Sequence, residues 1–383
     1  MLKNKDIICI STSDWLKPWG SKQQIMSRLS NTNRVLYIEY QASFLHPLRY
    51  PTLWHRYAIY PNGVIRKESN SLFIYTPPPL LPFGVYCRAI NKINQYLLCL
   101  FIKRVLKKVG FNDYILWIYP PWSVDLIDRL KPRRVIYHCI DDVANEKRIF
   151  IRRKTLENME DDLLKKAQYV FVLSEGLFKK FINRNQKTYY LPSGVDERFF
   201  NIDYGISLPD IDRINNPRLG IIGIFNERLD VDLIKHTAKS HSDWSIILIG
   251  PVVSNKKKIF SLRCFPNVYF LGWKNFERIP YYVKKLDVGL IPYKVNKFTN
   301  NISPLKLYEY LALGKPAVST DLAEIRRYKE VLKIAKDKYE FVTHISDLLT
   351  KSTDNLAEIR SKIARENIWD NRLETIRKVL AQE

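Results

Sequence analysis

One stretch decides the predicted fold, residues 299–320, which reads Thr-Asn-Asn-Ile-Ser-Pro-Leu-Lys-Leu-Tyr-Glu-Tyr-Leu-Ala-Leu-Gly-Lys-Pro-Ala-Val-Ser-Thr. Ser303 occupies a helix-cap position, and Pro304 follows at the first helical position, where its missing N–H costs nothing. Gly314 ends the helix, and Pro316 prevents its continuation before the next strand. The preceding residues, 286–293, read as a buried strand that stops at a proline. The pattern therefore predicts a strand, a helix and a second strand.

The predicted helix begins with an unusual charge. Lys306 lies in the first turn, where a carboxylate would suit the helix dipole better. A cation beside free backbone N–H groups is reasonable if an anion binds there. Glu309, three residues later, faces the same side and can accept hydrogen bonds from a diol. The residues alone leave open a second interpretation, in which Lys306 is solvated and Glu309 is its ion-pair partner.

This stretch resembles the nucleotide-sugar site of GT-B glycosyltransferases, especially family 4, in which a Glu-x7-Glu signature opens and crosses this helix. Glu309 matches the second glutamate, which the resemblance assigns to the ribose hydroxyls. Asn301 stands in place of the first, which usually touches the donor sugar. The Ser303-Pro304-Leu-Lys306 variant resembles a branch that includes teichuronic-acid and exopolysaccharide transferases. The resemblance implies that this helix start and Lys306 neutralise the donor diphosphate.

The resemblance also extends to other donor-side loops. It implies that Arg228, in the loop 224–230, grips the diphosphate, and that Trp273 and Lys274 edge the nucleobase. The sequence 230–232 reads Asp-Val-Asp, but acidic residues at a helix start are common, so we do not interpret it as a metal motif. We expect no metal and no cofactor, with the nucleotide sugar as co-substrate.

The loop after the first predicted strand, residues 6–10, is expected to face a ligand crevice, as in doubly wound domains. The resemblance places the acceptor-facing loop here, with Asp14, Trp15 and Lys22 as acceptor-side candidates. Trp15 is equally compatible with a packing role.

Two adjacent carboxylates, Asp141 and Asp142, follow the predicted strand 134–140. At the carboxyl end of a strand, either could act as general base for an acceptor hydroxyl. The alternative is a helix cap beside a surface aspartate. The resemblance favours catalysis, because related enzymes carry an acidic residue or a histidine at this place.

The composition narrows the class of protein. The chain has 383 residues, a net charge of +23, five cysteines and six histidines. The scattered, odd-numbered cysteines without CxxC spacing argue against a disulfide framework. A strong positive charge suits nucleic acid, an anionic membrane or an anionic substrate, but no RNA-binding signature is present and no nucleic acid is expected. Residues 1–5 lead directly into the strand-like residues 6–10, so we expect no secretory leader, and no apolar run approaches about 20 residues.

A basic amphipathic segment at 84–110 bears on localisation. Its apolar stripe comprises Tyr86, Ile90, Ile93, Leu97, Leu98, Phe101, Ile102 and Val105, and lysine and arginine surround it. Such a helix can lie in an anionic membrane surface or pack on the domain core, and the residues leave both open. We expect a cytoplasmic protein associated peripherally with the inner face of the membrane.

The alternation of strands and helices predicts an α/β protein with the GT-B fold, in which two doubly wound, parallel-sheet domains face a cleft. The predicted domains are an N-terminal acceptor-binding domain, 1–200, and a nucleotide-sugar-binding domain, 218–365. A terminal helix, 366–383, is expected to cross back to the first domain. The turn Pro192-Ser-Gly-Val-Asp196 resembles a family turn that marks the exit from the first domain, and 201–217 reads as a linker. Residues 41–83 read as irregular.

The resemblance implies a glycosyltransferase that moves a sugar from a nucleotide diphosphate donor, UDP being favoured, to a lipid-linked or polysaccharide acceptor. Alternatives are a GT-B nucleotide-sugar epimerase and a non-catalytic module that binds anionic lipid or RNA. The sequence does not specify the sugar, the base, the acceptor, the stereochemistry or the oligomeric state.

Overall fold

The computed structural model describes residues 2–16, 19–49, 54, 62–143, 152–202, 205–350 and 355–382. The chain divides into two compact units. Unit 1 comprises Met1–Pro192 and Leu373–Glu383, and unit 2 comprises Ser193–Arg372. The division thus falls at Pro192, before the predicted linker, and the last residues of the chain return to unit 1.

Unit 1 contains an eight-stranded sheet in the order β3-β4-β2-β1-β5-β6-β7-β8, in which only β3 and β4 pair antiparallel. The strands are β1 (Asp6–Ile10), β2 (Arg34–Ile38), β3 (Val64–Lys67), β4 (Leu72–Thr76), β5 (Tyr114–Ile118), β6 (Arg134–Cys139), β7 (Tyr169–Val172) and β8 (Thr188–Tyr190). The strand order reverses between β1 and β5, where doubly wound sheets bind their ligands.

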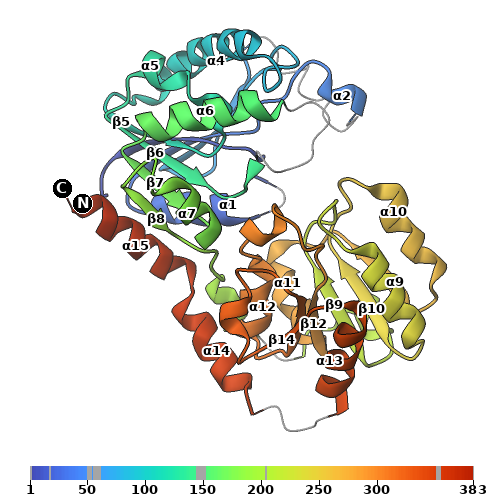
Figure 1. Ribbon diagram of the computed structural model, residues 1–383. Coiled ribbons are helices and arrows are strands. Elements are labelled where there is room, and N and C mark those ends of the chain that lie inside the picture. The colour runs from blue at the N-terminus through green and yellow to red at the C-terminus, as the bar shows by residue number, and fades with distance from the viewer. Residues whose placement is uncertain are drawn as a thin grey trace. The chain divides into compact units, whose positions relative to one another are not determined.

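Helices cover both faces of this sheet. They are α1 (Ser21–Leu29), α2 (His46–Arg49), α4 (Arg88–Val109), α5 (Leu126–Leu130), α6 (Arg153–Lys166), α7 (Glu175–Phe181) and the later part of α15 (Trp369–Ala381). Figure 1 shows α4, α5 and α6 over one face and α1 under the other. Ser174 caps α7 by accepting a hydrogen bond from the Leu177 N–H. The guanidinium of Arg134 donates to the Leu380 carbonyl at 3.5 Å, which ties α15 to β6.

The prediction that residues 41–83 are irregular is wrong in part. Strands β3 and β4 form the antiparallel edge of the sheet within this range. Both are short, and β3 carries Arg66 and Lys67 without a clear alternation of apolar and polar residues, so hydrophobic periodicity misses them. Residues 50–53 and 55–61 lie outside the described part of the chain.

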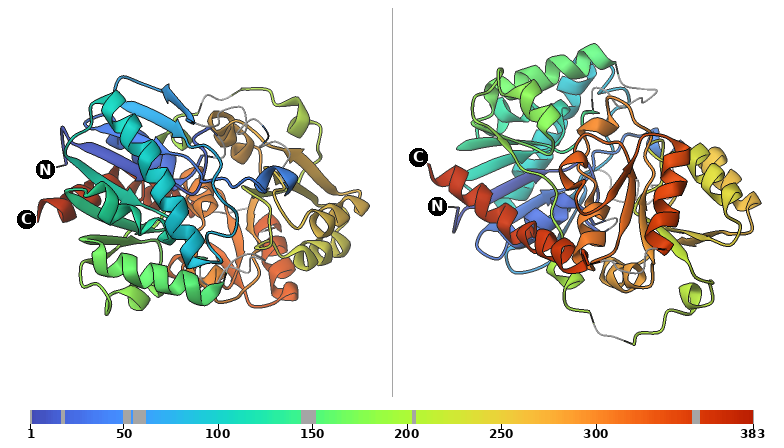
Figure 2. Two further views of the ribbon diagram at one scale, coloured as in Figure 1. Left: turned by 90° about the horizontal axis from the view of Figure 1, so that it is seen from above. Right: turned by 60° about the horizontal axis from the view of Figure 1, so that its bottom comes forward.

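Helix α4 turns only part of the predicted apolar stripe to solvent. Leu98 and Ile102 are fully buried in the core of unit 1, and Leu97 and Phe101 pack against it. This part of the stripe therefore serves core packing. The outward face carries Ile93 from the predicted stripe together with Tyr96 and Leu100, and the three are 50%, 47% and 38% exposed. Figure 2 shows α4 lying across the sheet of unit 1.

Unit 2 contains a six-stranded, all-parallel sheet in the order β11-β10-β9-β12-β13-β14. The strands are β9 (Arg218–Ile222), β10 (Ser245–Ile249), β11 (Val268–Gly272), β12 (Val288–Ile291), β13 (Ala317–Thr320) and β14 (Lys333–Ala335). Here the order reverses between β9 and β12. The loops after these two strands are therefore where the topology favours a ligand.

The helices of unit 2 form one layer on each side of the sheet. They are α8 (Pro209–Asp212), α9 (Val231–Ser240), α10 (Lys256–Phe260), α11 (Ile279–Lys284), α12 (Leu305–Ala312), α13 (Lys338–Thr350) and α14 (Ala357–Glu366). One apolar core contains residues of α11 and α12, and the other contains residues of α9 and α13. Figure 1 shows α9 and α10 apart from α11 and α12.

Helix α12 begins one residue later than predicted. Pro304 occupies the N-cap position, and no side chain caps the helix. Ser303 does not cap it because its hydroxyl accepts a hydrogen bond from the Ser193 N–H at 3.3 Å. Tyr310, fully buried, fixes the other side of α12 by donating its hydroxyl to the Gly220 carbonyl of β9 at 2.9 Å.

Among the described residues, no helix is both long enough and apolar enough to span a bilayer.

Candidate functional site

Three adjacent strands of unit 2 end in glycine. Gly223, Gly250 and Gly272 follow or end β9, β10 and β11, and all three have positive φ, at +117°, +145° and +68°. The Gly250 N–H donates to the Gly272 carbonyl at 2.8 Å, and a Cβ on Gly250 would lie 1.8 Å from the Gly223 carbonyl oxygen. We call these residues the glycine row. They form a surface of bare backbone that crosses two strand spacings, roughly 10 Å.

Lys306 lies at one end of the glycine row. Its side chain is only 5% exposed, and its ammonium lies 4.7 Å from the centre of the Tyr293 ring. A Cβ on Gly223 would be 3.8 Å from the ammonium nitrogen. Within the described ranges, the ammonium has no hydrogen-bond acceptor or ion-pair partner. Because an unpaired buried charge is costly, this arrangement favours an anion beside Lys306 and the first turn of α12.

Glu309 lies one turn further along α12. Desolvation by the surrounding protein raises the pKa of its carboxyl to about 7; the Lys306 charge opposes this rise, and the Asp196 charge adds to it. In the described part of the chain, the carboxyl accepts no hydrogen bond. The site therefore combines an unpaired cation with an acceptor group suited to hydroxyl donors.

Backbone pairing holds the neighbouring loop in place at the point where the strand order reverses. The Asp230 N–H donates to the Pro292 carbonyl at 2.8 Å, and the Lys294 N–H donates to the Arg228 carbonyl at 2.9 Å. The Arg228 guanidinium lies over the Phe298 ring, 4.8 Å from its centre. Asp230 itself caps α9 by accepting from the Leu233 N–H.

The turn predicted to mark the exit from the first domain belongs to this site. Ser193 donates its hydroxyl to the Ser303 carbonyl at 2.9 Å, which ties the turn to the start of α12. Asp196, in the same turn, acts electrostatically on Glu309. Asn301 ends a short 3-10 helix, Thr299–Asn301, and its amide donates to the Lys297 carbonyl at 3.3 Å. No local signal in the sequence links residue 193 to residue 303.

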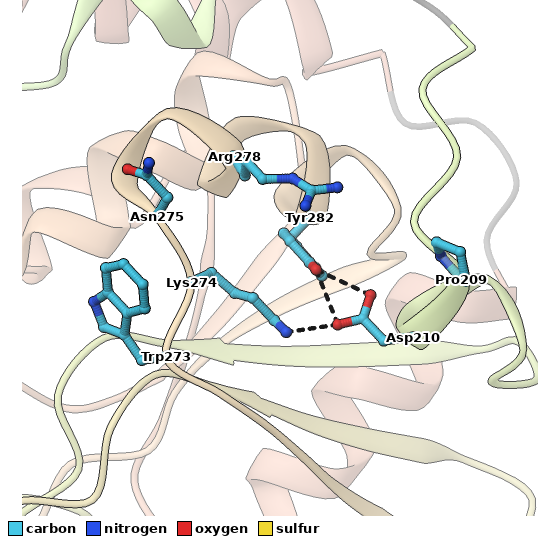
Figure 3. A pocket seen from close by; sticks show the side chains of 7 residues that line it. All are labelled: Pro209, Asp210, Trp273, Lys274, Asn275, Arg278 and Tyr282. Carbon is cyan, nitrogen blue, oxygen red and sulfur yellow. Dashed lines mark hydrogen bonds and ion pairs between the residues drawn. The ribbon is translucent and has the colours of Figure 1, made fainter.

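The other end of the glycine row leads to a cavity of about 440 Å³ (Figure 3). Trp273, which directly follows Gly272, is 41% exposed. The Lys274 ammonium lies 2.6 Å from the Asp210 carboxylate and 5.3 Å from the centre of the Tyr282 ring. Its charge is therefore engaged within the protein. The cavity is lined by Pro209, Asp210, Trp273, Lys274, Asn275, Arg278 and Tyr282.

In unit 1, the loop after β1 is held by a carboxylate that the sequence analysis did not select. Glu39, at the end of β2, accepts a hydrogen bond from the Trp15 N–H at 2.8 Å and pairs with Arg66 at 2.7 Å. Trp15 is 2% exposed and packs edge-on against Tyr37, with ring centres 5.0 Å apart. Its indole therefore has little surface left for a ligand.

The other two acceptor-side candidates keep part of their surface. The Asp14 carbonyl accepts from the Gln23 amide at 2.8 Å, which joins this loop to α1. The Lys22 ammonium lies 5.8 Å from the centre of the Tyr119 ring, which follows β5. Lys22 and Tyr119 thus meet where the strand order of unit 1 reverses.

The two aspartates after β6 differ in environment. Asp142 is 1% exposed and lies 3.1 Å from the Lys180 ammonium, which also pairs with the buried Glu160 at 3.2 Å. Asp141 keeps part of its surface, and its carbonyl accepts a hydrogen bond from the Val143 N–H. Asp142 thus has a structural ion-pair role, and Asp141 is the better placed of the two to meet a ligand.

Comparison with known proteins shows which families and folds this chain resembles. Residues 217–351, which contain all the donor-side candidates, match the family model described as glycosyl transferases group 1. Sucrose-phosphate synthase from Thermosynechococcus elongatus superposes with a TM-score of 0.73 at 14% identity, covering 99% of both chains. The protein has the GT-B fold.

Two other similar structures are complexes with a nucleotide or a nucleotide sugar. Anabaena HepE in complex with UDP and glucose has a TM-score of 0.66 at 16% identity, covering 98% of this chain and 99% of that one. An E. coli trehalose-6-phosphate structure bound with UDP-2-fluoro glucose has a TM-score of 0.71 at 11% identity, covering 99% of both chains. At identities this low, the structural likeness shows the GT-B fold and nothing further.

A curated relative adds a likeness in sequence. The protein provisionally named teichuronic acid biosynthesis glycosyltransferase TuaH, from Bacillus subtilis, is 27% identical over 256 residues. The match covers 62% of this chain and 64% of that relative. The family model and this relative are thus likenesses to glycosyltransferases, and the solved structures show the GT-B fold.

Proposed function

We propose that this protein is a glycosyltransferase that moves a sugar from a nucleotide diphosphate donor, UDP being favoured, to a lipid-linked or polysaccharide acceptor. The observation that carries the proposal is the buried ammonium of Lys306, which makes no hydrogen bond or close ion pair with a described residue and lies at one end of the glycine row. A diphosphate supplies the missing charge.

The donor lies along the glycine row. Its diphosphate contacts Lys306 and the free N–H groups at the start of α12. The ribose hydroxyls donate to Glu309, and the base stacks near Trp273, at the far end of the row. As the sugar bond breaks, negative charge grows on the leaving diphosphate, and a preorganised cation and N–H groups stabilise it. No metal is needed for this neutralisation.

Asp141 acts on the acceptor. In an inverting reaction it takes the proton from the attacking hydroxyl, whereas in a retaining reaction it orients the acceptor. Support comes from its place after β6 and from the contrast with Asp142, whose carboxylate is committed to Lys180.

Two observations bear on the choice of substrates. The similar structures that bind UDP or a UDP sugar favour a UDP donor. The name of the Bacillus subtilis relative favours a cell-envelope polysaccharide or its lipid-linked precursor as acceptor.

A lipid-linked acceptor requires work at a membrane surface, so we propose peripheral association through α4, on the cytoplasmic face. This helix carries six basic residues and no acidic one. Ile93, Tyr96 and Leu100 are exposed among them. The charge complements anionic lipid head groups, and the exposed apolar side chains insert at the interface.

The deciding experiment measures release of free UDP from UDP sugars with and without extracted membrane lipids, and identifies the product by mass spectrometry. Acceptor-dependent UDP release with a glycosylated lipid supports the proposal. Isomerisation of the UDP sugar without an acceptor would indicate an epimerase. Binding of lipid or RNA with no turnover of any nucleotide sugar would indicate a non-catalytic module.

Lys306→Met tests the role of the Lys306 ammonium, with UDP affinity measured by calorimetry. It should lower UDP affinity by about 1.5–3 kcal/mol, the scale for a hydrogen bond to a charged group. Lys333→Met, a lysine-to-methionine change on an exposed residue of β14, is the matched control and should leave affinity unchanged.

A further inference from the structure

A three-residue cluster fixes the loop that follows the glycine row. Asp210, from the short helix α8, lies 2.6 Å from the Lys274 ammonium. The Tyr282 hydroxyl, from α11, donates to both carboxylate oxygens of Asp210 at 2.9 Å. Figure 3 shows the three side chains converging from three segments of unit 2. We call them the Asp210 cluster.

The cluster is anchored in the body of unit 2. Tyr282 is 2% exposed and belongs to the apolar core that also contains α12. The Lys274 ammonium lies 5.3 Å from the centre of the Tyr282 ring, so both an ion pair and a cation–π contact hold it. Asp210 is thus hydrogen-bonded to a residue of the core, Tyr282, and in turn holds the Lys274 ammonium.

Holding Lys274 also orients its neighbour. Trp273 and Lys274 are consecutive, and Figure 3 shows their side chains pointing away from each other. The residue before them, Gly272, has a φ of +68°, and a Cβ there would meet nothing within 4 Å. The Gly272 carbonyl is held by the Gly250 N–H, and beyond it the ion pair and ring contact of Lys274 restrain the direction of the turn.

We infer that Asp210 is a positioning residue, which acts through Lys274 to present Trp273 to the nucleobase of the donor. The inference rests on the proposed function and deepens it. Asp210 lies in the range 201–217, which the sequence predicts to be a linker. In this inference Lys274 contributes to base binding through its ion pair with Asp210 and not by touching the base.

The test compares two ligands, UDP and inorganic pyrophosphate, by calorimetry. Asp210→Asn should weaken UDP binding about tenfold, the scale of coupling between residues in one network, and leave pyrophosphate binding unchanged, because pyrophosphate has no base. Asp212→Asn is the matched control. It lies on the same short helix and removes a similar ion pair, to Lys285 at 2.9 Å, but is remote from Trp273 in the network. It should change neither affinity.

Two double variants separate positioning from direct contact. With Trp273→Ala already present, Asp210→Asn should have no further effect on UDP affinity. With Asp210→Asn present, Lys274→Met should likewise add nothing, whereas a Lys274 that touches the base directly would still lose affinity.

The outcomes distinguish this inference from the proposed function. Equal loss of UDP and pyrophosphate binding in Asp210→Asn, or an unchanged UDP affinity, would overturn the positioning role while leaving the nucleotide site intact. Failure of the unmodified protein to bind either ligand would overturn the proposed function itself. Thermal unfolding of each variant shows whether any general loss of binding reflects loss of folded protein.

Discussion

Lys306 and Glu309 are charged side chains on one helix, and each lacks a hydrogen-bonded counterpart in the described part of the chain. For Lys306 the result is an unpaired buried cation. For Glu309 it is a carboxyl whose pKa is raised to about 7. A nucleoside diphosphate offers an anion to the first and hydroxyl donors to the second, so one ligand satisfies both groups.

Glu309→Gln should weaken UDP binding by about 1–3 kcal/mol, because the ribose loses a charged acceptor. A diol donates best to the ionised carboxylate, so UDP affinity of the unmodified protein should rise as pH increases through about 7. Calorimetry from pH 6 to 8.5 on both proteins checks this, since titration of the ligand phosphates affects both equally. Parallel pH profiles would contradict the role of Glu309.

The same raised pKa has a consequence for stability. Because the folded-state pKa lies above that of the unfolded chain, the neutral carboxyl is favoured in the fold, and this contribution is lost as pH rises through about 7. Without nucleotide, the stability of Glu309→Gln relative to the unmodified protein should therefore be greater at pH 8 than at pH 5. Thermal unfolding at the two pH values measures this difference.

Asp141 and Asp142 should separate in their effects. Asp141→Asn should lower turnover by about 100-fold or more if it is the general base, with donor affinity unchanged. Asp142→Asn should instead destabilise the fold by about 1–3 kcal/mol, because it removes a buried ion pair to Lys180. Turnover assays and denaturant unfolding are run on both. A stability loss in Asp141→Asn as large as in Asp142→Asn would assign both to structure.

At the level of elements, local sequence patterns predicted those helix and strand boundaries that depend only on neighbouring residues. The body of α12, its end at Gly314 and the strands on either side follow from proline, glycine and apolar spacing, and the structure confirms them. The contacts of Ser303 were not predictable, since they depend on Ser193, 110 residues away. The ion pair between Asp210 and Lys274 escaped for the same reason.

Helix α4 shows a second limit of sequence patterns. Its apolar residues were predicted as one stripe, yet part of them fills the core and part faces outward. A long helix with apolar residues on more than one side does not reveal which side meets the sheet. Only the packed structure separates Leu98 from Ile93.

Membrane association should depend on the outward side of α4. The double variant Ile93→Ser, Leu100→Ser should lose the part of binding to anionic liposomes that survives high salt, because that part comes from inserted apolar groups. Leu98→Ser, at a fully buried position, is the matched comparison and should lower thermal stability instead. Sedimentation with liposomes at low and high salt measures the binding. If the unmodified protein ignores anionic liposomes, the proposed surface is wrong.

At the scale of the whole molecule, the donor-side candidates all fall within unit 2, and those assigned to the acceptor all fall within unit 1. The fold class was predictable from the sequence, because alternating strands and helices favour two doubly wound sheets. The roles given to the two halves stay predictions. The division at Pro192 was not, since the turn 192–196 is attached to α12 by tertiary contacts.

UDP alone should slow amide hydrogen exchange in unit 2, in the loops after β9, β10 and β11 and in the first turn of α12. The loops after β1 and β5 in unit 1 should change little until an acceptor is added. Exchange followed by mass spectrometry reports both units in one experiment. Protection that appears first in unit 1 would reverse the assignment of the two substrates.

The glycine row also limits how this protein can change by mutation. Any side chain at residue 250 would collide with the Gly223 carbonyl, so only glycine is compatible with the backbone there. Residue 272 has open space and a left-handed conformation, which asparagine adopts at small cost. Variation in this part of the site is therefore confined to the end next to Trp273, while the end next to Lys306 is fixed. As such a sequence diverges, the part of the site that meets the donor base would change before the part that meets the diphosphate.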